Sequence, residues 1–156
     1  MRVFAATAFL ILIALFVGCG SADDSTPVAC LEGAEAYERA LSAAPGEVLL
    51  GDETLISECL TRNQSGGDIT RVGEALIETA TALNAEARAK PGGAANLQLG
   101  YLLGAVERGA EESEGIHTDL VRRLVVAARY VPGKQTQPPG FLPTYSEGFE
   151  AGRSDG

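Results

Sequence analysis

The spacing of its apolar residues limits what this chain can fold into more than any other feature. Between residues 28 and 131, leucine, isoleucine, valine and alanine recur at intervals of three and four, which places them on one face of a helix. No segment shows the apolar–polar alternation expected of a half-buried strand. Glycine and proline interrupt the pattern in clusters that are typical of helix ends. The sequence therefore predicts an all-α fold, a small bundle of about five helices.

The predicted helices occupy residues 28–43, 53–63, 69–89, 94–112 and 119–130. Asp68 and Thr118 are the expected N-caps of the third and fifth helices, because short polar side chains accept hydrogen bonds from the first free amides of a helix. In the fourth helix, Gly100 and Gly104 lie one turn apart and leave a groove that another helix can approach closely. We expect packing within the domain to fill this groove, with dimerisation as the alternative.

The C-terminal segment, residues 132–156, is predicted to be a linker followed by a Pro/Gly-rich strap. Phe141, Tyr145 and Phe149 recur at every fourth position of this segment. This spacing favours a strap, or a helix of a single turn, that docks on the bundle through its aromatic side chains. A mobile peptide that binds a partner and plain disorder are the alternatives.

The N-terminus has the composition of an export signal. Met1-Arg2 supplies one positive charge, and the fifteen residues 3–17 are uncharged and almost wholly apolar. As a helix these residues extend roughly 22 Å, which falls short of the ~30 Å hydrocarbon core of a membrane. That length is typical of the apolar region of a signal peptide rather than of a permanent membrane span.

The apolar run ends in Phe16-Val17-Gly18-Cys19, which resembles the lipobox cleaved by the signal peptidase of bacterial lipoproteins. The usual lipobox is leucine, then alanine or serine, then glycine or alanine, then cysteine. Gly18 and Cys19 match it, whereas Phe16 and Val17 depart from the commonest residues. The resemblance covers residues 1–19 only.

The resemblance implies a bacterial lipoprotein precursor in which residues 1–18 are the signal peptide and Cys19 is the site of lipid attachment. Two or more acyl chains suffice for stable anchoring, so we expect the protein on the extracytoplasmic face of the cell membrane. Residues 19–27, small and polar, would then form a flexible spacer before the helical domain at residues 28–131. An uncleaved N-terminal anchor and a secretory signal cut near Gly18 or Ala22 are the alternatives.

The same resemblance affects the other two cysteines. With Cys19 assigned to lipid, Cys30 and Cys59 remain as an even pair in an exported chain, the setting in which disulfides persist. We therefore expect a Cys30–Cys59 disulfide, with two buried free thiols as the alternative. No metal site is expected, since His117 is the only histidine and the chain contains no CxxC spacing.

The net charge of the chain limits its partners. It is −9, and loss of residues 1–18 removes Arg2 but no acidic residue, which leaves −10. Such a protein repels phosphate backbones and anionic headgroups. We therefore expect no nucleic-acid partner and no docking on a membrane through a polybasic segment.

No arrangement of catalytic residues is recognisable in the sequence, so we predict neither an enzyme nor a cofactor. His117 precedes Thr118-Asp119 at a loop-to-helix junction, and no serine stands in a nucleophile elbow. The acidic residues between 111 and 119 lack the alternating ligands and central glycine of a calcium loop. They are more simply explained as a solvated face.

The region between residues 104 and 123 holds the densest mixture of polar residue types, and a functional face is most expected there. Its members are Arg108, His117, Arg122 and Arg123. The predicted function is that of a membrane-tethered envelope protein that binds a protein partner or supports envelope structure. The alternative is a small-ligand-binding lipoprotein with a pocket lined by Tyr37, Tyr101 and Tyr130.

Overall fold

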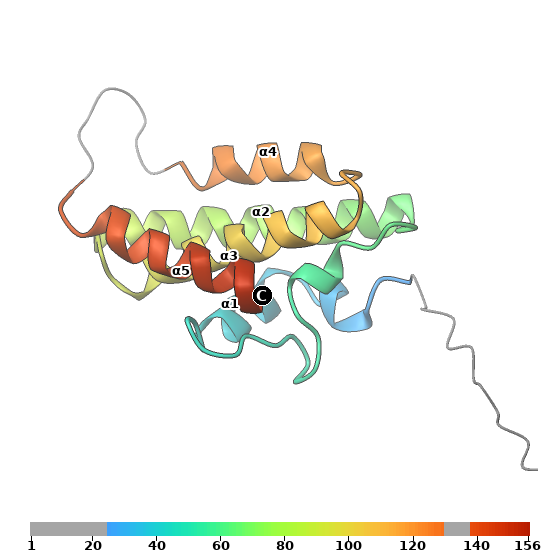
Figure 1. Ribbon diagram of the computed structural model, residues 1–156, viewed down its shortest axis with the longest axis horizontal. Coiled ribbons are helices and arrows are strands. Elements are labelled where there is room, and N and C mark those ends of the chain that lie inside the picture. Colours follow the sequence, from blue (N-terminus) through green and yellow to red (C-terminus); the bar gives the residue numbers. More distant parts are fainter. Residues whose placement is uncertain (1–24, 130–137) are drawn as a thin grey trace, which may run out of the picture.

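The computed structural model describes residues 25–129 and 138–156, and these form a small helical bundle (Figure 1). The α-helices are α1 (Ala34–Leu41), α2 (Gly66–Ala89), α3 (Ala94–Glu112), α4 (Thr118–Ala127) and α5 (Phe141–Asp155). Two 3₁₀ turns accompany them, η1 (Val28–Leu31) and η2 (Ser57–Cys59). The described part of the chain contains no β-strand, only an isolated bridge between Leu50 and Thr54. The predicted all-α bundle is confirmed.

Helix α3 is the centre of the bundle, since it contacts each of the other four α-helices. Figure 1 shows α2 and α3 side by side, with α4 on one side of this pair and α1 on the opposite side. The side chains of Leu99, Leu102 and Val106 on α3 are fully buried, as is that of Leu76 on α2. These side chains follow the apolar period seen in the sequence. Burying them supplies most of the driving force for the helix pairing.

The first two predicted helices are wrong in extent. The segment 28–43 is broken at Gly33, which has a φ of 89° and separates η1 from α1. A residue with a Cβ rarely adopts this left-handed conformation, so the helix cannot run through. The segment 53–63 contains only η2. Its apolar side chains Ile56, Cys59 and Leu60 are nevertheless buried, from the short η2 turn and the residues on either side of it rather than from an α-helix.

The predicted N-caps are also shifted. Helix α2 begins at Gly66, and its cap is Ser65, whose hydroxyl accepts a hydrogen bond from the amide of Asp68 at 3.1 Å. Asp68 therefore lies in the first turn, where its negative charge interacts favourably with the positive end of the helix dipole. Helix α4 begins at Thr118 itself, with His117 in the cap position, and the Thr118 hydroxyl donates to the carbonyl of Gly115 at 2.6 Å. The predicted range of α3 is confirmed at both ends.

The C-terminal segment forms a helix of 15 residues, α5, instead of a strap or a single turn. It runs parallel to α3, and four glycines bring the two backbones together. A Cβ atom placed on Gly100 or Gly104 would overlap the backbone of Tyr145 or Phe149 on α5. The groove predicted from the two α3 glycines is thus filled from within the chain. Gly148 and Gly152 of α5 face the α3 backbone in the same way.

The predicted row of aromatic side chains lies along one face of α5. The ring centroids of Phe141 and Tyr145 are 5.9 Å apart, and those of Tyr145 and Phe149 are 6.3 Å apart, both pairs stacked. Tyr145 and Phe149 are half-buried against the core, and Phe141 is buried. The tail is therefore docked through its aromatic face, as the spacing predicted.

Candidate functional site

The predicted disulfide is present between Cys30 and Cys59, whose Cα atoms are 5.5 Å apart. Both cysteines are fully buried, and the bond joins η1 to η2. The hydroxyl of Tyr37 donates a hydrogen bond to the carbonyl of Cys30 at 3.0 Å and so ties α1 to η1. Cys19 lies outside the described residues, so its lipid attachment stays a prediction.

The four residues of the predicted functional face occupy three different environments. Arg108 donates to Glu112 at 3.0 Å and to the carbonyl of Ser154 at 2.9 Å, which ties α3 to α5. His117 is buried, and its Nε2 atom lies 3.2 Å from the carbonyl oxygen of Thr61. Arg122 and Arg123 are exposed on α4. The structure therefore does not bring these side chains together into one cluster.

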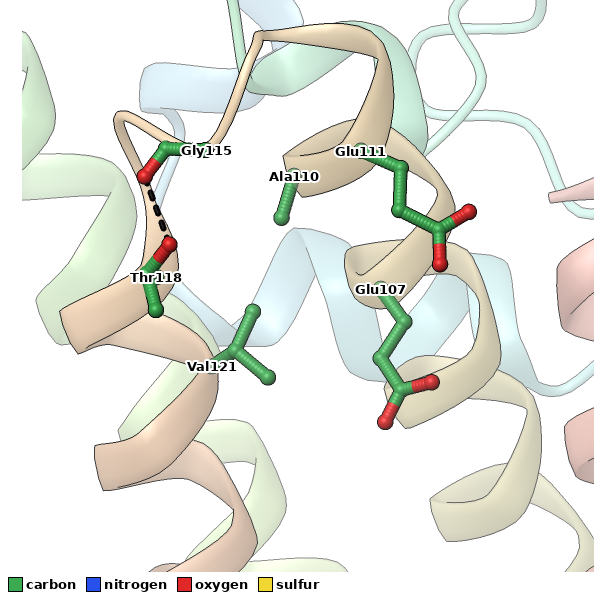
Figure 2. A pocket seen from close by; sticks show the side chains of 6 residues that line it. All are labelled: Glu107, Ala110, Glu111, Gly115, Thr118 and Val121. Atoms are coloured by element: carbon green, nitrogen blue, oxygen red, sulfur yellow. Dashed lines mark hydrogen bonds between the residues drawn. The ribbon is translucent and has the colours of Figure 1, made fainter.

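A shallow depression does occur in the same region, between α3 and α4, and is named here the α3–α4 notch (Figure 2). Its lining residues are Glu107, Ala110, Glu111, Gly115, Thr118 and Val121. It has a volume of about 270 Å³ and is open to solvent. In Figure 2 the side chains of Ala110 and Val121 lie toward the space between the two helices, while both carboxylates point to the α5 side of α3.

Arg153 of α5 holds the two carboxylates at the edge of the notch. Its guanidinium donates to both carboxylate oxygens of Glu111, at 3.0 and 2.9 Å, and to Glu107 at 3.3 Å. The hydrogen bond from Arg153 is the main cause of a lowered pKa at the Glu111 carboxyl, and it raises the pKa of Arg153 in turn. The three groups together retain one negative charge beside an apolar floor.

The lining of the notch can bind a side chain of a partner. Its floor of small and aliphatic side chains can receive the stem of a partner's side chain, and its acidic edge favours a basic head group. None of its lining residues is a histidine, cysteine or lysine. Sequence reasoning pointed to this region but not to these residues. The available signal was the small residues Ala110 and Gly115, which leave the hollow, together with Val121 one turn into α4.

The tyrosines of the alternative ligand pocket belong to the core. Tyr37 and Tyr101 are both fully buried, and this burial is the first cause of the raised pKa of each phenol. Tyr130 lies outside the described residues. Among residues 25–129 and 138–156, no three His, Cys, Asp or Glu side chains are grouped to hold a metal ion. No helix in these ranges has both the length and the apolar composition needed to cross a membrane. No protein-family model, curated protein or solved structure matches the chain.

Proposed function

We propose that this chain is a lipoprotein of the cell envelope, tethered to a membrane through lipid on Cys19, whose helical body binds another protein. The observation that carries the proposal is the Cys30–Cys59 disulfide. Structural disulfides persist mainly outside the reducing cytosol, which agrees with export. The bond also leaves Cys19, at the end of the lipobox-like sequence, as the one cysteine of three with another use.

The length of the spacer keeps the body close to the membrane. Ser25, the first described residue, is six positions after Cys19, and an extended chain of six steps spans about 20 Å. The body therefore stays within roughly one domain diameter of the bilayer. A binding surface on it meets partners in the envelope rather than in bulk solution.

The α3–α4 notch favours a protein partner over a small ligand. Small-molecule sites enclose most of their ligand in clefts of roughly 300–1,000 Å³, whereas the notch is smaller, at about 270 Å³, and open. An open notch fits one side chain of a larger partner. The excess of acidic residues on the chain, with the carboxylates of Glu107 and Glu111 at the edge, favours a basic side chain with an aliphatic stem.

The lipid tether is tested by intact mass spectrometry of the protein isolated from its native membrane. We expect an N-terminus at an acylated Cys19 and a mass two hydrogens below that of the fully reduced chain. Replacing the cysteine, Cys19→Ser, should move the protein out of the lipidated membrane fraction, whereas Cys30→Ser with Cys59→Ser should leave the acylation unchanged. An intact Met1 terminus on the native protein would contradict the proposal.

The partner is tested by placing a photo-crosslinking amino acid at Thr118, on the edge of the notch, in cells. We expect one discrete cross-linked protein, with a yield that falls when Val121→Asp puts a charge on the notch floor. The matched control is the same probe at Thr81, an exposed position of α2 outside the notch. Equal capture from both positions, or capture that Val121→Asp does not change, would exclude the notch as the binding surface.

A further inference from the structure

Helix α4 differs from the other α-helices of the described residues in its charge. Each of α1, α2, α3 and α5 has more acidic than basic residues. Helix α4 has Arg122 and Arg123 against Asp119, and Arg129 follows two residues after its end. Arg122 pairs loosely with Asp119, at 3.7 Å, and Arg123 forms no ion pair with the described residues. A net positive charge on this helix is unexpected in a chain with a net charge of −9.

The same helix concentrates exposed apolar side chains. Of the five large hydrophobic side chains exposed in the described residues, three lie on or just before α4, namely Ile116, Val125 and Val126, with exposed fractions of 53%, 42% and 59%. Leu120 and Leu124 hold the opposite side of the helix against α2 and α3. Single exposed hydrophobics are ordinary, but here Val125 and Val126 share the solvent-exposed side of one helix with Arg122 and Arg123.

We propose that this α4 outer face, made of Arg122, Arg123, Val125, Val126 and Arg129, lies against the anionic headgroups of the membrane that holds the tether. Basic, partly apolar helices bind anionic membranes in this way, since the aliphatic groups enter the interface while the cations meet lipid phosphates. The inference rests on the proposed lipid tether at Cys19 for the proximity of the membrane.

The spacer enters the body beside the beginning of α4. Ser25 and Pro27 line a depression together with Thr61. The carbonyl of Thr61 is in turn the contact of His117, the residue before α4, at 3.2 Å from its Nε2 atom. With about 20 Å of spacer between Cys19 and Ser25, the membrane that holds the lipid is within reach of this helix.

The negative charge of the whole chain does not prevent this contact. The Debye length is about 8 Å at physiological ionic strength, so headgroups respond mainly to the nearest side chains. Figure 1 places α4 at one side of the α2–α3 pair and the acidic α1 at the opposite side. The expectation against membrane docking came from the net charge alone, and the local distribution of charge revises it.

A lipid surface fits the α4 outer face better than a protein does. Arginine is common in protein hot spots as well as at lipid surfaces, but the α4 outer face has none of the tryptophan or tyrosine that anchors such hot spots, and its apolar residues are valines, which are under-represented in them. Spread arginines between small aliphatic groups suit a fluid layer of phosphates, which adapts to the protein. A second copy of this acidic chain remains the competing occupant, and the experiment separates the two.

The experiment attaches an environment-sensitive fluorophore to Val126→Cys in the full chain, purified from its native host with its own N-terminus and reconstituted in vesicles. Phosphatidylcholine vesicles with and without phosphatidylglycerol are compared, with a lipid-borne quencher. We expect strong quenching at position 126 with phosphatidylglycerol and little without it. A fluorophore at Glu38→Cys, on α1, is the matched position and should stay unquenched.

The arginines provide the specific control. Each of Arg122→Gln and Arg123→Gln should shift the ratio of docked to undocked bodies about fivefold toward undocked, whereas Arg39→Gln on α1 should not change it. Equal quenching at positions 38 and 126 overturns the proposal. So does quenching at position 126 that changes neither with phosphatidylglycerol nor with substitution of the arginines. A fluorescence change at position 126 that depends on protein concentration without vesicles also overturns it and assigns the face to a second copy. The mass of the same sample shows separately whether Cys19 carries lipid, and so tests the tether independently of the docking.

Discussion

Two buried asparagines join parts of the fold that are far apart in the sequence. Asn84 of α2 donates from its amide to the carbonyls of Ala127 and Arg129, at 2.8 and 3.1 Å, and so closes the C-terminal end of α4. Asn96 of α3 donates to the carbonyl of Phe141, at 2.8 Å, where α5 begins. The last carbonyls of a helix have no partner within the helix, so the bonds from Asn84 satisfy carbonyls at the end of α4. The bond from Asn96 ties α3 to the first residue of α5.

Removing the amide of Asn84 should therefore loosen α4. In Asn84→Ala, Arg88 still donates to the Arg129 carbonyl, but the Ala127 carbonyl loses its side-chain donor. We expect a loss of about 1–3 kcal/mol in the free energy of unfolding, measured by urea denaturation. Thr81→Ala, on the exposed side of the same helix, should change it by no more than about 0.5 kcal/mol. Equal effects of the two substitutions would show that the bond does not stabilise the fold.

The disulfide makes a larger contribution at the residue scale. Cys30 and Cys59 are separated by 29 residues, and closing a loop of that length restricts the unfolded chain. In the chain-entropy model the bond stabilises the fold by about 3–4 kcal/mol. We expect Cys30→Ala with Cys59→Ala to lower the free energy of unfolding by that amount in urea. A reducing agent should have the same effect on the native protein and none on the double variant.

The Arg153 bridge predicts a pH effect whose sign follows from its geometry. The guanidinium holds the pKa of the Glu111 carboxyl below its usual range. The contribution of this bridge to stability is therefore complete above the ordinary pKa of glutamate and is lost as the pH falls through the lowered value. We expect the Glu111 midpoint, measured by NMR titration of the side-chain carboxyl, to rise in Arg153→Gln. An unchanged midpoint would mean that the bridge is not populated in solution.

At the scale of elements, the parallel pairing of α3 with α5 depends on glycine. Gly100, Gly104, Gly148 and Gly152 let the backbones approach so closely that a methyl group at any of the four would overlap the facing helix. Glycine is a poor helix former, costing about 1 kcal/mol relative to alanine. Close packing of the backbones offsets that cost, and the gain appears only once both helices are in place.

Filling the interface should separate the two helices. In Gly148→Ala the new Cβ meets the backbone of Leu97, so we expect a loss of at least about 1–3 kcal/mol in stability and faster hydrogen exchange of the amides of α5. Gly67→Ala is the control, because a Cβ there meets nothing closer than the Ser65 hydroxyl oxygen, at 3.8 Å. Unchanged exchange in α5 of the Gly148→Ala variant would contradict this packing.

The elements predicted well are those whose signals are local. Helix α3 has a continuous apolar period and a Pro-Gly-Gly break before it, and both of its ends were predicted from these. Helix α5 was missed because Pro143 and two interior glycines oppose a helix locally. Pro143 is tolerated in the first turn, where its missing amide has no helical partner. The buried residues around η2 repeat with a helical period, which predicts a longer helix, but the helix there is the single 3₁₀ turn Ser57–Cys59.

In the candidate site, too, the features with a local signal in the sequence were predictable and those that depend on distant contacts were not. The cysteine pair was predictable because the chain offers few combinations, whereas the α3–α4 notch was not. Its acidic edge is arranged by Arg153, which is 46 residues away from Glu107 and lies on a helix that the sequence did not indicate. Contacts between distant elements depend on the packing of α5, and packing between helices leaves little trace in a single sequence.

At the scale of the whole molecule, the structure changes where the spacer should be considered to end. Thr26 is buried and accepts a hydrogen bond from Gln64 at 3.0 Å, and the carbonyl of Pro27 accepts one from the amide of Cys30. Both residues therefore belong to the folded body, although residues 19–27 were predicted to be flexible. The part of the chain free to act as a tether ends near Ser25.

A chain that begins at Ser25 should therefore be monomeric in solution and more stable than one that begins at Val28. The shorter chain loses the two hydrogen bonds of Thr26 and Pro27, so we expect it to unfold at lower urea, with a difference of about 1–3 kcal/mol. Light scattering after gel filtration measures the mass, and urea denaturation the stability. Equal stability of the two chains would mean that residues 25–27 belong to the spacer and not to the folded body. A dimer formed by the longer chain without lipid would contradict the expected monomer and would make a second copy the competing occupant of the α4 outer face.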